Sequence, residues 1–303
     1  MRVAPKIFHQ TILAYRGFHY AWWALGLGLV SWLIYLIPNY EQPANGGTWQ
    51  GYTLGTVGAL LIVWLLWLGI RKRRYDGGIG TVQGWVSAHV YLGTTLLWVA
   101  TLHTGFQFGW NLHTLAYGLM ATVIISGMLG VWAYLVLPAR MVRQRDNRTR
   151  DELLLAIVEV DRQCLRLAQD VHPDVGAFVQ SALDRTVLGG SLLQQLSGRD
   201  RSSVEIRGGK ENSTAQRIVR NRNQGQVIRA LAERLARSPG GKEAVLLQEL
   251  LWLFARRKTL LQQVLADVRL QGWLQLWLLV HVPLSLALLV ALVLHIFSVF
   301  YYW

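Results

Sequence analysis

The chain has 303 residues, of which 52% are hydrophobic and 14 are tryptophan, and its formal net charge is +13. A soluble protein would spread its apolar residues periodically along the chain. Here they are concentrated in blocks of about 20 residues, which is the length of helix that crosses a bilayer. The single cysteine, Cys164, excludes an internal disulfide and an iron–sulfur cluster held by this chain's own thiolates.

Five apolar blocks are long enough to form membrane-spanning helices. They run over Tyr20–Ile37, Tyr52–Ile70, Val82–His103, Leu112–Leu137 and Trp273–Tyr301. We therefore predict an all-α fold, an integral membrane bundle of five transmembrane helices. Residues 1–137 would supply four helices, and residues 273–303 would supply the fifth and complete the bundle.

Lysine and arginine are distributed unevenly around these blocks. They precede the first block, follow the second at 71–74 and follow the fourth at 140–150, whereas the short connections 38–51 and 104–111 contain none. The positive-inside rule then predicts a cytoplasmic N-terminus and an external C-terminus at Trp303. The expected location is a bacterial inner (cytoplasmic) membrane, with several passes.

Residues 138–272 form a polar, basic segment, which we predict to be a mainly helical cytoplasmic insertion between the fourth and fifth transmembrane helices. Helical patterns cover Asp151–Asp170, Ala215–Arg237 and Lys242–Leu270, and Gly189–Ser213 has the composition of a loop. The segment carries no phosphate-binding loop and no dinucleotide fingerprint, so we interpret it as a scaffold or docking surface. Its charge favours contact with anionic membrane lipid, and no nucleic-acid recognition motif accompanies it.

Two of the apolar blocks each contain a pair of histidines fourteen residues apart, His89 with His103 and His281 with His295. Fourteen residues is close to four helical turns, so the members of a pair share one face, about 21 Å apart. Ionisable residues inside membrane helices are costly to place and are usually functional. One helix separates the two blocks, so they run in the same direction and their histidines match in depth. His89 would lie level with His281 near the cytoplasm, and His103 with His295 near the outside.

Four histidines in two layers are what two bis-histidine b-type haems require. A lone intramembrane histidine can instead hydrogen-bond within a bundle, and zinc is a weaker alternative because no third ligand is evident at either depth. Small residues such as Gly93, Gly127 and Ser285 would leave room for a flat macrocycle, although ordinary close helix packing uses them too.

His113 opens the fourth block near the depth of His103 and His295. It could replace one of them as a ligand, contact a haem propionate or take part in a quinone pocket. An interfacial histidine without a specific role would also occupy such a position.

The H-x13-H spacing, repeated in two parallel helices with one helix between them, resembles the transmembrane domain of ferric reductases and NADPH oxidases. It also resembles the cytochrome b of cytochrome bc complexes and, more loosely, other bacterial dihaem membrane cytochromes. The resemblance covers the third to fifth blocks. It implies that His89, His103, His281 and His295 are axial haem ligands and that electrons pass between the two haems across the membrane. The chain lacks the Pro-Glu-Trp-Tyr motif of the bc family, and its insertion belongs to neither pattern.

Bis-histidine iron has no open coordination position, so it suits electron transfer better than oxygen chemistry. We therefore expect the electron-transfer subunit of a quinone-linked oxidoreductase, with quinone or quinol as the bound substrate. Its partners would be other redox subunits, such as a c-type cytochrome or an iron–sulfur protein. The alternatives are a non-enzymatic membrane anchor for a cytoplasmic or periplasmic partner, and a transporter with a polar midplane site.

Overall fold

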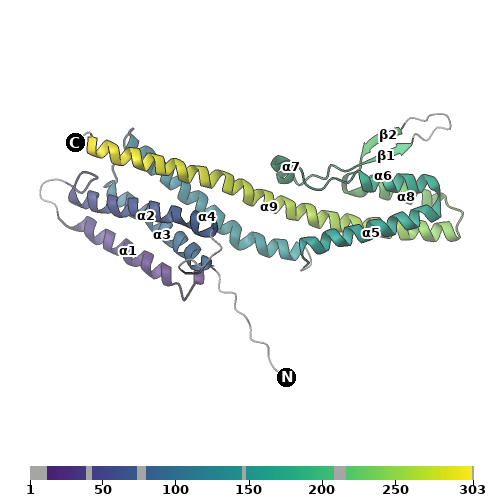
Figure 1. The fold of residues 1–303 in the computed structure, drawn as a ribbon, viewed down its shortest axis with the longest axis horizontal. Coiled ribbons are helices and arrows are strands. Elements are labelled where there is room, and N and C mark those ends of the chain that lie inside the picture. The colour runs from purple at the N-terminus through teal and green to yellow at the C-terminus, as the bar shows by residue number, and fades with distance from the viewer. Residues whose placement is uncertain (1–11, 39–42, 74–79, 145–147, 208–215, 302–303) are drawn as a thin grey trace, which may run out of the picture. The chain divides into compact units, whose positions relative to one another are not determined.

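In the computed structural model, the described residues are 12–38, 43–73, 80–144, 148–207 and 216–301. They are predominantly helical, with one antiparallel two-stranded sheet (Figure 1). The main elements are α1 (His19–Leu36), α2 (Trp49–Arg73), α3 (Val82–His103), α4 (Leu112–Gln144), α5 (Arg150–Val171), α6 (Pro173–Asp184), α7 (Leu192–Ser197), β1 (Ser203–Arg207), β2 (Gln216–Arg220), α8 (Gly225–Arg237) and α9 (Lys242–Tyr301). Each of the five predicted apolar blocks is helical, apart from Ile37, which caps α1.

The chain divides into two compact units. The first unit comprises Met1–Leu135 and Trp277–Trp303, and the second comprises Val136–Leu276. The first unit therefore contains α1 to α3, most of α4 and the C-terminal end of α9, which is yellow in Figure 1.

In the first unit, α3 packs closely against both α1 and α2. Leu54, Val99 and Leu102 form a buried cluster between α2 and α3. A second cluster joins α2, α3, α4 and α9, with Ile62, Leu65, Leu96, Met120 and Leu288 as its buried members. The end of α9 is thus part of the same bundle as the first four helices, although it follows them by more than a hundred residues in the chain.

Among the described residues, four helices are long and apolar enough to cross a membrane. These stretches are Trp49–Lys72, Val82–His103, Leu112–Leu137 and Lys242–Tyr301. Large apolar side chains such as Leu60, Leu129 and Phe297 point away from the bundle and are more than half exposed. A bundle in water would present polar groups on that face, so this pattern is compatible with a multi-pass membrane protein.

The helix α1 forms where the sequence predicts it but is not among those four. It has 18 residues, and its outer face carries the exposed side chains of Trp22, Trp23 and Leu25. A membrane crossing by α1 therefore stays a prediction, and so does the count of five spans.

The second unit has its own hydrophobic core, built from α5, α6, α8, β1 and the N-terminal part of α9. The predicted helix over Asp151–Asp170 is confirmed as α5. It begins with a capping box in which Thr149 Oγ1 accepts from the Glu152 amide and the Glu152 carboxylate accepts from the Thr149 amide. Such a cap satisfies backbone donors that the first turn of a helix leaves without partners. The predicted Lys242–Leu270 helix is confirmed as part of α9.

Two sequence expectations for the second unit are wrong. Gly189–Ser213 was expected to be a loop but contains α7 and β1, and Ala215–Arg237 was expected to be one helix but begins with β2. The strands pair antiparallel, with Val204 opposite Val219. Such short strands gain their stability from each other and from the burial of Val204, which the local sequence pattern does not reveal.

Candidate haem-binding site

The four paired histidines lie on two helices, His89 and His103 on α3 and His281 and His295 on α9. All four side chains are half-buried. Each ring is therefore held by neighbouring helices and still has accessible surface. Their role as ligands stays a prediction, and the geometry of each ring shows what it can bind.

The two histidines of α3 donate hydrogen bonds to backbone carbonyl groups of α2. His89 Nδ1 lies 3.1 Å from the carbonyl oxygen of Leu65, and His103 Nδ1 lies 2.7 Å from that of Gly51. A carbonyl oxygen only accepts, so Nδ1 carries the hydrogen in both rings. In a neutral imidazole this leaves a lone pair on Nε2.

His281 is held in the same tautomer by Ser126 of α4. Its Nδ1 lies 2.6 Å from the hydroxyl oxygen of Ser126, which itself donates to the carbonyl oxygen of Val123 at 2.8 Å. Because the hydroxyl has one hydrogen and uses it on Val123, it accepts from His281 Nδ1. The Nε2 of His281 is therefore also a lone-pair donor.

His295 contacts His113, the histidine whose role the sequence left open. Their Nδ1 atoms are 2.6 Å apart, and their ring centres are separated by 4.6 Å. One ring donates this hydrogen bond and the other accepts it. When His113 accepts, His295 has the same tautomer as the other three histidines. Among the described residues, none of the four Nε2 atoms has a hydrogen-bond partner.

The structure brings together one of the predicted pairs. The ring centres of His103 and His295 are 6.0 Å apart. Two imidazoles bound to opposite sides of one metal ion, with metal–nitrogen bonds of about 2 Å, have ring centres roughly 6 Å apart. The spacing of His103 and His295 therefore fits one shared metal ion.

The number of candidate donors bears on the choice between a haem and a bare metal ion. In the described part of the chain, no group of three or more His, Cys, Asp or Glu side chains could hold a metal ion. A zinc site takes three or four protein ligands, whereas a haem iron takes only its two axial ligands from the protein. The predicted pairs would supply two axial ligands at each depth, and His113 lies beside the external pair as a third histidine.

A glycine allows close approach to one of the rings. A Cβ at Gly55 would lie 2.7 Å from Cε1 of His103, whereas a Cβ at Gly127 would make an ordinary 3.5 Å contact with Cε1 of His281. Gly127 was among the small residues expected near a ligand. Gly55 was missed, although Gly51 and Gly55 form a small-xxx-small pattern on α2 that is typical of tight membrane helix contacts.

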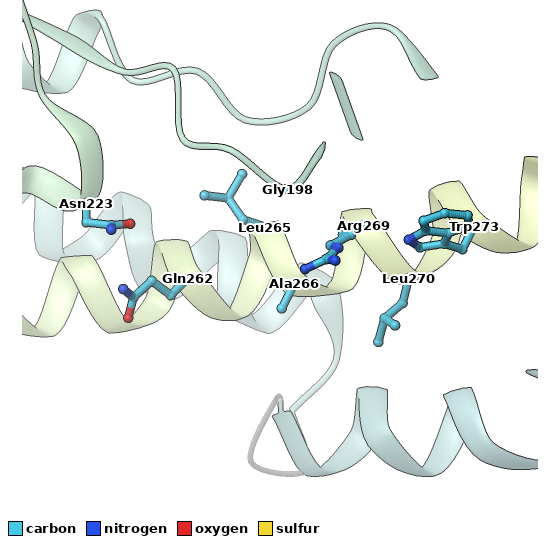
Figure 2. Close-up of a pocket in the computed structure, with 8 residues that line it drawn as sticks. All are labelled: Gly198, Asn223, Gln262, Leu265, Ala266, Arg269, Leu270 and Trp273. Carbon is cyan, nitrogen blue, oxygen red and sulfur yellow. The ribbon is translucent and has the colours of Figure 1, made fainter. Parts of the chain in front are cut away.

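A pocket in the second unit has a different character (Figure 2). It is lined by Gly198, Asn223, Gln262, Leu265, Ala266, Arg269, Leu270 and Trp273. Most of these residues come from one stretch of α9. The lining contains no histidine, cysteine or carboxylate, so this pocket offers no ligand for the predicted metal.

No protein-family model, curated protein or solved structure matches this chain.

Proposed function

We propose that this protein binds two b-type haems and transfers electrons between them across a membrane. His89 and His281 would hold the cytoplasmic-side haem, and His103 and His295 the external-side haem. One observation carries the proposal. Every one of these rings engages Nδ1 in a hydrogen bond and leaves Nε2 without a partner among the described residues. Metal-binding histidines are typically oriented in this way, by an acceptor on the other ring nitrogen.

The proposed topology has five membrane crossings, with α1 as the first. An 18-residue helix is about 27 Å long, close to the roughly 30 Å of a bilayer hydrocarbon core. The exposed Trp22 and Trp23 near its start suit the membrane interface, where tryptophan is enriched. By the positive-inside rule, the basic segments favour a cytoplasmic N-terminus and insertion in a bacterium, and an external C-terminus. Both chain ends lie outside the described residues.

When bound, the haems would supply one-electron redox chemistry without an open position for oxygen. The residues of this chain would hold the two groups at fixed depths and exclude water from them. We propose quinol or quinone as the exchange partner within the membrane. Other redox subunits, such as a c-type cytochrome or an iron–sulfur protein, would complete a quinone-linked oxidoreductase. His113 lies where it could contact a haem propionate or a quinone as well as His295.

The test is a reduced-minus-oxidised optical spectrum of the purified protein, with haem quantified as its pyridine complex. We expect a low-spin b-type spectrum and two haems per chain. His89→Ala and His103→Ala should each remove one haem, whereas His19→Ala, outside the predicted pairs, should retain both. Protein made with ample haem that contains none would refute the proposal. It would favour a membrane anchor or a transporter instead.

A further inference from the structure

Ser126 of α4 bonds two residues of α9, the predicted ligand His281 through its hydroxyl and Trp277 through its main-chain carbonyl. The hydroxyl accepts from His281 Nδ1, because its own hydrogen is donated to the carbonyl oxygen of Val123. The main-chain carbonyl oxygen of Ser126 accepts a hydrogen bond of 2.7 Å from Nε1 of Trp277. Ser126 is therefore fixed in place by the same helix that carries the histidine.

Trp277 also contacts the ring of His281 directly. It precedes His281 by one helical turn on α9, and the two rings stack with their centres 5.3 Å apart and an interplanar angle of 28°. Gly130 of α4 leaves room for the indole, because a Cβ at Gly130 would overlap it. Trp277 thus restricts the plane of the His281 imidazole by stacking on one of its faces, and Ser126 determines its tautomer.

We propose that Ser126 is a positioning residue for the cytoplasmic-side haem, an inference that rests on the proposed function. By accepting the Nδ1–H of His281, the hydroxyl holds Nε2 toward the iron and makes the imidazole a stronger donor. A stronger donor stabilises ferric iron, so this hydrogen bond lowers the midpoint potential of that haem and slows its loss. None of these contacts involves the external-side pair.

The experiment compares Ser126→Ala and Ser126→Thr with the wild-type protein in the intact chain. Thr122→Ala, one helical turn before Ser126 on α4, is the matched control. The hydroxyl of Thr122 also donates to the preceding turn of its own helix, at the carbonyl oxygen of Gly118 at 2.8 Å, and the side chain is exposed. The measurements are the midpoint potential, the low-spin electron paramagnetic resonance signal and the rate of haem transfer to apomyoglobin. His89→Ala and His103→Ala, each with one remaining haem, assign the signals to the two sites.

We expect Ser126→Ala to weaken retention of the cytoplasmic-side haem by about 10- to 100-fold. Its midpoint potential should rise and its resonance signal should shift, while the external-side haem stays unchanged. Ser126→Thr keeps the hydroxyl and should restore the wild-type values, and Thr122→Ala should match the wild type throughout.

Wild-type retention, potential and signal in Ser126→Ala would overturn the inference. If Ser126→Ala loses the haem entirely, the haem content of Ser126→Thr decides whether the hydroxyl has the proposed role. Retention in the threonine variant supports a role for the hydroxyl, and loss in both variants contradicts it. A wild-type protein without haem is a different result, because it refutes the proposed function itself.

Discussion

Gly55 of α2 lies directly against the imidazole of His103 on α3. A Cβ built at Gly55 would be 2.7 Å from Cε1 and 2.9 Å from Nδ1 of that ring, closer than real carbon contacts allow. The same ring donates from Nδ1 to Gly51 O, one turn earlier on α2. The backbone of α2 therefore fixes both the position and the tautomer of His103.

Gly55→Ala should consequently displace the His103 ring and remove or weaken the external-side haem, with the cytoplasmic-side haem retained. Alanine favours helix over glycine by roughly 1 kcal/mol, so a weaker helix cannot explain the loss. Haem per chain and the optical spectrum are the measurements. Gly58→Ala is the control on the same helix, because its Cβ would make an ordinary 3.7 Å contact with Leu96. Equal haem content in both variants would contradict the prediction.

His113→Ala separates a ligand from a neighbour of a ligand. Because His113 bonds Nδ1 of His295, its removal should leave two haems per chain but weaken external-side retention by about 10- to 100-fold. His295→Ala should remove that haem outright. Haem stoichiometry and the rate of haem loss distinguish the two variants. If His113→Ala loses the haem and His295→Ala keeps it, His113 is the ligand.

Cys164 should be chemically inert in the folded protein. Burial, with a smaller contribution from the nearby Asp161 charge, raises the pKa of its thiol to about 12. The folded state thus favours the neutral thiol over the thiolate. The contribution of Cys164 to the free energy of unfolding is therefore complete below the unfolded pKa near 9, and it is lost as the pH rises toward the folded pKa of about 12.

Mass spectrometry after maleimide treatment at pH 8 tests this directly. We expect no modification of the native protein over a time in which the denatured protein is fully modified, since the reactive thiolate is rare and enclosed. Stoichiometric modification of the native protein would show that Cys164 is accessible.

The ion pair between Arg257 and Asp161 should be important for the second unit. Arg257 is 1% exposed, and its Nε and Nη2 lie 2.6 and 3.3 Å from the two carboxylate oxygens. Arg257→Ala leaves the partly buried carboxylate of Asp161 without its partner. Breaking a fully buried pair costs roughly 3–5 kcal/mol, and because Asp161 is only partly buried we expect a loss of unfolding free energy no larger than that.

Limited proteolysis and thermal unfolding would measure that loss. Arg256→Ala is the matched control, because the Arg256 guanidinium lies over the ring of the exposed Trp252 and contributes about 0.5–1 kcal/mol. Replacing both partners, as in Arg257→Met with Asp161→Leu, should recover much of the stability. Similar losses in the Arg256 and Arg257 variants would contradict a special role for the buried pair.

The helices were predictable because their signal is local. The Val82–His103 block coincides with α3, and Asp151–Asp170 lies within α5, since apolar content, periodicity and caps act over neighbouring residues. The β1–β2 hairpin was missed for the converse reason. Its pairing joins Ser203 to Arg220, and five-residue strands carry too little pattern to reveal a partner so far along the chain.

By itself, the sequence determined the long apolar helices and the fourteen-residue spacing that puts each histidine pair on one helix face. Both are set by the repeat of the α-helix and by the apolar character of consecutive residues. Only the tertiary structure decided which groups face the rings, namely the carbonyls of Gly51 and Leu65, the hydroxyl of Ser126 and the imidazole of His113. These partners come from other helices, and their selection depends on how side chains pack between helices distant in the chain.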